Sequence, residues 1–520
     1  MASLAGIRLQ LWVLGAIRAT EAIAWTSIFP YAYYMVQSFH QVKQDQVAFY
    51  AGSLVAVFTF CEFLSGMVWA RISDRIGRKP TLMIGILCSI VAALCFGFAR
   101  SIELAIAARA FGGLFNPNVF LVQTCTGELA AREQQANAFS LVTFIRSLGN
   151  LIGPVLGGLL AHPVALYPSV FSEHSVWAHY RYLLPNLAVV SMQLSTMIMA
   201  VLFLRETHPN FINRHDVGLS ISQSFHGFFQ SLLTGMRQFS YSPLRADRSG
   251  HGADNAIDDY ELENQGSPPA ATRHLNPAEL CSENQGSRTC EEVKEEGAPP
   301  GRTFSSQIIL QILSLSLLAF HKVSSDTTMG SFLALAPSQD QHGDSVHGPG
   351  FLLEAKGGFG FNTQKIGVIF LTEAIFRVMI QGAVVPFLIT RLGALKAYRW
   401  ALGIYPAMYL VTPFFPGLPS SWKLVALLPD LWSKVALSSI GYVCSAILIT
   451  NTVPSKQALA KINGAAASFG CLARSVGPLL SGKLFDLGVQ RGHMEIPFWL
   501  LAAVALAGAG ESIFLADHPE

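Results

Sequence analysis

Acidic residues occur inside long apolar stretches of this sequence, where a charged side chain is usually ion-paired or functional. Glu62 lies in the middle of one stretch, and Glu21 lies in another, three residues after Arg18. Carboxylates in a cavity of low dielectric can take up and release protons near neutral pH, although each can equally serve as a static ion-pair partner. The acids that we expect to carry protons are Glu21, Glu62, Asp326 and Glu373.

Basic side chains accompany these acids in the same stretches. Arg18 and Glu21 are three residues apart, and Glu373 and Arg377 are four apart, so each pair can form an ion pair on one helix face. Such basic groups either neutralise the acids or bind an anionic substrate. The residues that we expect to line a substrate cavity are Arg18, Arg146, His321, Arg377 and Arg474.

The composition indicates what kind of protein holds these residues. Of the 520 residues, 51% are hydrophobic and only 13% are charged, against roughly 25% charged in a typical soluble protein. These values exclude a soluble, disordered, collagen-like or disulfide-rich secreted protein. A net charge of +2 is too small to indicate a nucleic-acid partner. We therefore predict an all-α polytopic membrane protein in a lipid bilayer.

Twelve apolar stretches are long enough to cross a bilayer, which takes about 20 residues. The predicted spans are residues 11–37, 48–70, 80–99, 104–127, 137–161, 184–205, 306–336, 365–389, 398–416, 433–452, 464–486 and 495–515. The one long polar segment, 207–304, has few apolar residues and much Gly, Pro and Ser, which is typical of a disordered linker. We expect an N-terminal six-helix bundle (1–206), this linker, and a C-terminal six-helix bundle (305–520).

The charges of the short loops predict the orientation of the chain. The loop after the second span carries Arg71, Arg75, Arg78 and Lys79, and the loops after the eighth and tenth spans are also basic. Under the positive-inside rule both termini and the 207–304 linker are then cytoplasmic. We expect the plasma membrane rather than the vacuolar membrane.

The two sets of six spans share a pattern of glycine and proline. Gly77 is matched by Gly393, 316 residues later. Gly153 and the proline after it are matched by Gly477 and its own proline, 324 residues later. The matches fall in the second and eighth spans and in the fifth and eleventh. An internal repeat of six spans is typical of transporters built from paired bundles.

The loop after the second span has an ordered set of charges. It reads Asp74-Arg75-Ile76-Gly77-Arg78-Lys79-Pro80. Gly77 permits a tight turn between two antiparallel helices, and Asp74 can pair with basic residues or with a helix N-terminus across the bundle. Such a contact can hold one gate state and release in the other, whereas the plain alternative is a basic loop that only sets orientation. The predicted gating residues are Asp74, Arg75, Gly77, Arg78 and Lys79.

The fifth span contains small residues at regular intervals. Gly149, Gly153 and Gly157 are four residues apart, and Pro154 and Gly158 follow two of them. Small residues at this spacing let helices approach closely, and proline bends the helix. Ordinary helix packing with no directional meaning is the alternative to a functional motif.

Arg109 is a charge inside the predicted fourth span. Placing such a residue in a membrane costs roughly 2.5–3.5 kcal/mol on insertion scales, so it usually faces a cavity or a partner. The alternative is a side chain that extends to the outer interface.

These three motifs resemble those of the major facilitator superfamily. The loop is similar to the family's G-x-x-x-D-R-x-G-R-K motif, with Ala70 in place of the first glycine. The fifth span resembles the antiporter motif G-x-x-x-G-P-x-x-G-G, and Arg109 with Gly113 resembles the family's span-4 element. Within the family the chain is most similar to fungal twelve-span drug:proton antiporters of the zinc-induced-facilitator-like branch. Many relatives have Asn-Gly-Asn where this chain has Asn116-Pro117-Asn118, and we expect that proline to bend the fourth span.

The resemblance implies a major facilitator fold, with twelve helices in two bundles, that works by alternating access. It implies a part for Arg109 in proton coupling, and efflux of a small organic compound, such as a secondary metabolite or toxin, in exchange for protons. The alternatives are a proton symporter that imports an organic acid, peptide-like solute or metal chelate, and a receptor that signals through the linker. We expect a monomer that is not an enzyme. No nucleotide loop or His/Cys cluster is evident, so we expect no cofactor and no bound metal.

Overall fold

The computed structural model describes residues 4–130, 135–208, 210–212, 216, 218, 305–337, 357–452 and 456–516. These residues form helices and, apart from one isolated bridge between Pro337 and Gly357, no β-structure. The predicted 207–304 linker lies almost entirely outside the described residues. The all-α prediction is confirmed for the part of the chain that the structure describes.

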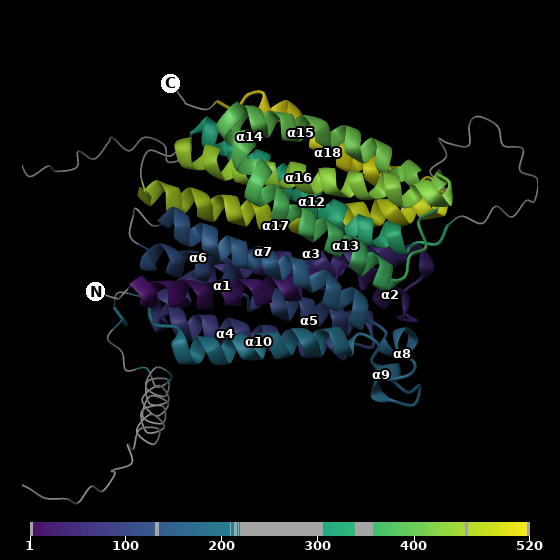
Figure 1. Ribbon diagram of the computed structural model, residues 1–520, viewed down its shortest axis with the longest axis horizontal. Helices are drawn as coiled ribbons and strands as arrows, with labels where there is room; N and C mark the ends of the chain where they lie inside the picture. Colours follow the sequence, from purple (N-terminus) through teal and green to yellow (C-terminus); the bar gives the residue numbers. More distant parts are fainter. Residues whose placement is uncertain are drawn as a thin grey trace, which may run out of the picture. The chain divides into compact units, whose positions relative to one another are not determined.

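The first half of the chain forms helices that run side by side, with their axes roughly parallel (Figure 1). The long helices are α1 (Leu4–Thr26), α3 (Val47–Ile76), α4 (Arg78–Gly97), α5 (Ile102–Leu114), α6 (Asn118–Leu129), α7 (Gln135–Leu160) and α10 (Leu183–Phe203). Three short helices lie in the connections: α2 (Ala32–Gln37) after α1, and α8 (Pro163–Leu166) and α9 (Val176–His179) after α7.

The second half repeats this arrangement. Its helices are α12 (Ser306–Ala334), α13 (Thr363–Met379), α14 (Val385–Leu392), α15 (Ala394–Val411), α16 (Ser420–Thr452), α17 (Lys456–Arg491) and α18 (Ile496–Ser512). A π-helical segment, Ile380–Val384, joins α13 to α14, and a 3₁₀ segment, Thr412–Gly417, follows α15.

By length and hydropathy alone, eight helical segments among the described residues qualify as membrane spans. The other four of the twelve predicted spans are α1, α15, α17 and α18. Charged residues lower the hydropathy of the first three, and α18 has only 17 residues. All four pack along the qualifying helices, for example α1 on α7 and α17 on α3. Within the described residues the twelve segments therefore form two sets of six.

The fourth predicted span is interrupted. Helix α5 ends at Leu114 and α6 begins at Asn118, with Pro117 between them. Proline has no N–H to donate and disfavours helical geometry in the residue before it. The predicted bend is confirmed. It leaves Asn116 outside regular helix, with its side chain buried.

Several predicted boundaries differ from the structure, and those of the tenth and eighth spans bear on the site. The tenth span was expected at 433–452, but α16 begins at Ser420, because Pro429 is accommodated inside the helix. The eighth span was expected at 365–389, and the structure extends it to Leu392 through the π-helical segment. The earlier start of α16 brings Asp430 into the membrane-spanning region.

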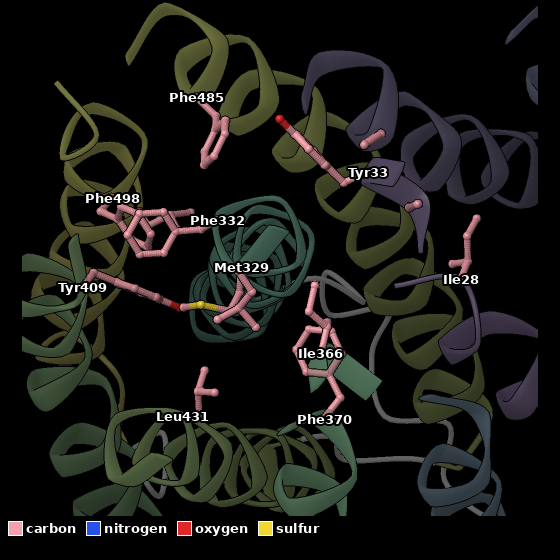
Figure 2. Close-up of a cluster of buried hydrophobic side chains, with 14 of the residues drawn as sticks. Ile28, Tyr33, Met329, Phe332, Ile366, Phe370, Tyr409, Leu431, Phe485 and Phe498 are labelled. Atoms are coloured by element: carbon pink, nitrogen blue, oxygen red, sulfur yellow. The ribbon is translucent and has the colours of Figure 1, made fainter. Parts of the chain in front are cut away.

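The core of the second half is centred on α12. Phe332 makes edge-to-face contacts with Phe359, Phe485 and Phe498, with ring centroids 5.5, 6.5 and 5.1 Å away. Figure 2 shows Phe332 and Met329 on α12 among side chains from the surrounding helices. Such aromatic contacts add to the stabilisation that burial supplies. They fix α12, which also carries part of the candidate site.

The internal repeat is visible in the backbone. Gly77 and Gly393 both have positive φ, 105° and 79°, at the junctions α3–α4 and α14–α15. Gly153 of α7 lies against α1, and Gly477 of α17 lies against α12 in the same way. A side chain would be strained at Gly77 and Gly393 because of their positive φ, although Gly393 has open space around it, and it would overlap a neighbour at Gly153 and Gly477.

Candidate functional site

The charged loop ties several helices of the first half together. Arg78 pairs with Asp74 at 2.6 Å and with Glu128 of α6 at 3.2 Å. Lys79 pairs with Asp216 at 2.6 Å and donates to the carbonyl of Val201 at 2.9 Å. The loop motif therefore holds the end of α3 and the start of α4 against α6, α10 and the segment that follows α10.

Glu206 completes this loop and was not predicted as a site residue. Its carboxylate accepts hydrogen bonds from the backbone N–H groups of Arg78 and Lys79, at 2.9 and 3.1 Å. These amides belong to the first turn of α4, where a negative charge is stabilised by unpaired N–H groups and the helix dipole. Asp74 pairs within its own half, and Arg75 is exposed. No contact from either to the second half occurs among the described residues.

The glycines of the fifth span lie where helices touch. Gly153 is close to Thr26 and Ile23 at the end of α1, where an added Cβ would overlap the hydroxyl of Thr26 and lie 3.0 Å from the carbonyl oxygen of Ile23. Gly149 meets the backbone of Ala19 in α1, and Gly157 meets the backbone of Ser27, the residue that follows this helix. Gly158 faces the second half, where an added Cβ would lie 2.6 Å from the Cα of Gly367 in α13. Helix α7 thus packs by backbone contact against both halves.

A cavity of about 110 Å³ lies between the helices of the first half and α17. Its ionisable lining residues are Arg18, Glu21, Glu62, Arg109, Arg146 and Arg474. The six include three predicted proton-coupling residues and three predicted substrate residues. Apolar and aromatic side chains form most of the rest of the wall, among them Trp25, Tyr31 and Phe58.

Asn116 connects the two acids of this cavity. Its side-chain amide donates to Glu21 and to Glu62, in each case at 3.2 Å. Glu21 is also ion-paired with Arg18. Glu62 is buried, and its carboxylate accepts a hydrogen bond from the thiol of Cys471 in α17, with 3.9 Å between sulfur and oxygen. The carboxylate of Glu62 therefore sits where α3 of the first half meets α17 of the second.

Arg109 points into the cavity rather than to the interface. Its Nε donates to the carbonyl of Leu54 at 2.9 Å, and its guanidinium lies 4.3 Å from the ring centroid of Phe58. One terminal nitrogen of Arg109 is buried with no hydrogen-bond partner among the described residues. Burial of an unsatisfied donor is costly, so this nitrogen is free to bind a group that enters the cavity.

A second group of charges lies between α12 and α13, away from the cavity lining. Lys322 is ion-paired with Asp326 and lies 4.0 Å from Glu373. Glu373 in turn pairs with Arg377 at 3.4 Å. The structure thus brings two predicted proton carriers together around Lys322. His321 is buried beside this group, and its Nδ1 is 2.9 Å from the hydroxyl of Tyr409.

Asp430 and Lys434 form a buried pair that was not among the predicted site residues. The two are 2.8 Å apart, almost fully buried, and share the hydroxyl of Thr412. The i, i+4 spacing of an acid and a base was the available signal, but the predicted tenth span began after Asp430. No group of three or more His, Cys, Asp or Glu that could hold a metal ion occurs among the described residues.

Comparison with known proteins agrees with this geometry. The family model of the Major Facilitator Superfamily matches residues 14–478. The chain belongs to the Major Facilitator Superfamily. It is 34% identical to the "Major facilitator superfamily multidrug transporter mfsB" of Aspergillus fumigatus, over 98% of this chain and 83% of that protein.

Two further comparisons cover nearly the whole chain. "Protein ZINC INDUCED FACILITATOR 1" of Arabidopsis thaliana is 23% identical over 96% of this chain and 90% of that protein. The crystal structure of a D-xylose-proton symporter matches with a TM-score of 0.62 and 12% identity, covering 98% of each chain. The fold is thus the major facilitator fold, and the chain is a multi-pass membrane transporter rather than an enzyme.

Hydrogen bonds between the two bundles of this major facilitator protein concentrate at one end, the end that carries α8 and α9 (Figure 1). There Asp486 of α17 accepts hydrogen bonds from the backbone N–H groups of Ala48 and Phe49 at the start of α3. Tyr34 donates to the carbonyl of Phe361 at the same end. Nearer the middle, hydrogen bonds join Glu62 to Cys471 and Ser147 to Gln381. Among the described residues, no hydrogen bond joins the bundles beyond these, toward the end that carries Gly77.

Proposed function

We propose that this transporter exports a small organic compound in exchange for protons. The observation that carries the proposal is the position of Glu62, a buried carboxylate at the seam of the two bundles. The name of the Aspergillus fumigatus relative, a multidrug transporter, and the glycine motif of α7 support export. Protons and substrate are thereby expected in the same cavity.

The chemistry follows from the groups around Glu62. When ionised, Glu62 accepts hydrogen bonds from the side-chain amide of Asn116 and from the thiol of Cys471 on α17. Protonation removes the charge and weakens these charge-assisted bonds, so it changes the balance between states in which α3 and α17 are joined or parted. A ligand can shift such a balance only through different interactions with the two states. A proton on Glu62 meets that condition.

Sidedness completes the proposal. The basic loop at the Gly77 end is cytoplasmic under the positive-inside rule. The bundles are hydrogen-bonded to each other at the opposite end, so we assign the structure to a state closed to the outside. We also propose that residues 1–206 and 305–520 form the two bundles and that a cytoplasmic linker, 207–304, joins them. We propose that the protein lies in the plasma membrane.

The test is proton flux in reconstituted vesicles that contain a pH-sensitive dye. A pH gradient is imposed, and a panel of organic compounds is added one at a time. Compound-dependent proton movement opposite to the compound supports antiport, and Glu62→Gln is expected to abolish it. Glu103→Gln is the matched control, because Glu103 is an exposed acid in the first turn of α5, outside the cavity.

Other outcomes would replace the proposal. Proton movement in the same direction as the compound would make the protein a symporter that imports an organic acid, a peptide-like solute or a metal chelate. Binding of a compound without any flux would favour a receptor that acts through the linker. Unchanged antiport in the Glu62→Gln variant would remove this residue from the coupling mechanism.

A further inference from the structure

The charge of the cavity is unbalanced. Four arginines and two glutamates line it, an excess of two formal positive charges. The walls of a transport cavity have a low dielectric, in which an uncompensated charge interacts strongly with whatever enters. The sign of the excess therefore bears on the class of compound that the cavity accepts.

Only one of these four arginines is paired with an acid of the cavity. Arg18 is ion-paired with Glu21. Glu62, the other acid, receives its hydrogen bonds from Asn116 and Cys471 and has no arginine nitrogen within the 4.0 Å of an ion pair among the described residues. Three guanidinium groups of the cavity thus have no carboxylate partner within the part of the chain that the structure describes.

Each of the three guanidinium groups has N–H donors that make no hydrogen bond to the described residues. Arg146 makes no hydrogen bond or ion pair with the described residues. Arg474 donates to the sulfur of Cys471 at 2.9 Å, but its Nε is buried without a partner. Arg109 has the same condition at one terminal nitrogen. Guanidinium groups bind carboxylates, sulfonates and phosphates through paired N–H donors, and a buried unpaired charge is costly until an anion arrives.

Most of the remaining wall is apolar, although Thr59, Ser89 and Asn186 also line it. It includes the rings of Trp25, Phe58 and Phe96, together with Ile28 and Val189. The guanidinium of Arg109 lies over the ring of Phe58, which joins the basic and aromatic parts of the wall. A compound that fits both parts carries an anionic group next to an aromatic or aliphatic body.

We infer that the cavity selects organic anions, in which a carboxylate, sulfonate or phosphate group is bound by Arg146, Arg474 and Arg109. This inference rests on the proposed transport function and names the substrate class of the same cavity. It agrees with export by proton exchange, because a membrane potential that is negative inside drives an anion outward and a proton inward. A cation is repelled from the cavity by the same charges.

The test compares three compounds with one ring and different charge. Benzenesulfonate is anionic, benzenesulfonamide is neutral and benzamidine is cationic. Thermal unfolding of the purified full chain in detergent is measured at equal ionic strength, because a ligand that binds only the folded state raises the unfolding temperature. We expect benzenesulfonate to bind at least roughly tenfold more tightly than the other two. Equal affinity for all three, or preference for benzamidine, would overturn the inference.

Variants separate a bound anion from a general effect of charge. Arg146→Gln and Arg474→Gln should each weaken benzenesulfonate binding at least roughly tenfold and leave benzenesulfonamide binding unchanged. Arg146→Lys, which keeps the charge, should retain part of the affinity and serves where the glutamine variant does not fold. Arg100→Gln is the control, since Arg100 lies over the ring of Tyr180 and does not line the cavity. Unaltered benzenesulfonate binding in all cavity variants would show that these arginines do not bind the anionic group.

The vesicle assay with the same compounds tells the two proposals apart. Preferred binding of benzenesulfonate without any proton flux would leave the inference standing and count against proton-coupled transport. Proton exchange with benzamidine or benzenesulfonamide in preference to benzenesulfonate would support proton-coupled transport and overturn the preference for anions. Exchange of benzenesulfonate for protons supports both.

Discussion

Asp486 of α17 accepts a hydrogen bond at 2.9 Å from the backbone N–H of Ala48 in α3, so a carboxylate of one bundle caps a helix of the other. The next amide, that of Phe49, donates to the second oxygen at 2.8 Å. These amides lie in the first turn of α3, where no helical carbonyl is available to them. Opening of the bundles at this end has to break both bonds.

Asp486→Asn should therefore favour the state open at the α8 end. The amide keeps one acceptor oxygen and loses the charge, a change of about 1–2 kcal/mol, or roughly 5- to 30-fold in the population of open molecules. The measurement is the rate at which Cys471, kept as the one cysteine of the chain, is labelled from outside by an impermeant maleimide. Glu173→Gln, on an exposed loop, should label like the parent protein. A variant that labels no faster would show that the cap does not control opening.

Gly158→Ala should block closure of the same end. The added methyl group would lie 2.6 Å from the Cα of Gly367, and backbone on both sides cannot move aside as a flexible side chain would. We expect transport to fall at least roughly tenfold, with a loss of about 1–3 kcal/mol in the stability of the closed state. Gly464→Ala is the control, because Gly464 has no neighbour within 4 Å in the described part of the chain. Equal transport by both variants would contradict the close-packing argument.

Asp74→Asn should separate stability from transport. The Asp74 side chain is 59% exposed, and its pair with Arg78 belongs to the class of surface ion pairs worth about 0.3–0.5 kcal/mol. The unfolding temperature should hardly change. If the loop is a gate, however, uptake of a labelled compound into vesicles should fall. Normal uptake would leave the loop with orientation as its only role.

Glu206→Gln provides the contrast within the same loop. Glu206 caps the first turn of α4 with both carboxylate oxygens, and loss of such a cap costs about 0.5–2 kcal/mol. Here we expect a lower unfolding temperature together with reduced transport. A stability equal to that of the parent protein would argue that the cap is replaced by another group.

Asp430 and Lys434 form a pair that should tolerate removal of both partners better than removal of one. Their side chains are 4% and 5% exposed. Breaking a buried pair costs about 3–5 kcal/mol, whereas replacing both members with apolar residues is often neutral. Lys434→Met alone should reduce the folded fraction measured by gel filtration in detergent, and Asp430→Leu combined with Lys434→Met should restore it. Failure of the double variant to recover would assign the pair a role other than mutual neutralisation.

Much of the fold could be predicted from local sequence. The apolar stretches located the helices, and Pro117 predicted the break in the fourth span. The start of α16 was wrong by more than ten residues, because Pro429 favours a helix end in sequence but lies inside this helix. Tertiary packing compensates for the hydrogen bond that the proline lacks.

The site was predictable in its residue types and less so in its groupings. Arg146 and Arg474 line the cavity, whereas His321 and Arg377 belong to the charge group around Lys322. Periodicity indicates that a charged residue is inside a bundle but not which neighbouring helix it faces. Glu206 illustrates the same limit, since its partners lie 127 and 128 residues earlier in the chain and no local pattern joins them.

The anchoring of Glu206 to the start of α4 also decides where the polypeptide can be cut. The hydrogen bond of 2.9 Å to Arg78 and the pair between Lys79 and Asp216 hold residues 206 and 216 against the start of α4, ahead of residue 226. A break introduced between His226 and Thr303 would cross none of the contacts that join α3 to α17 or α7 to α13. We therefore expect the two halves, expressed from separate genes, to reassemble in the bilayer through these contacts.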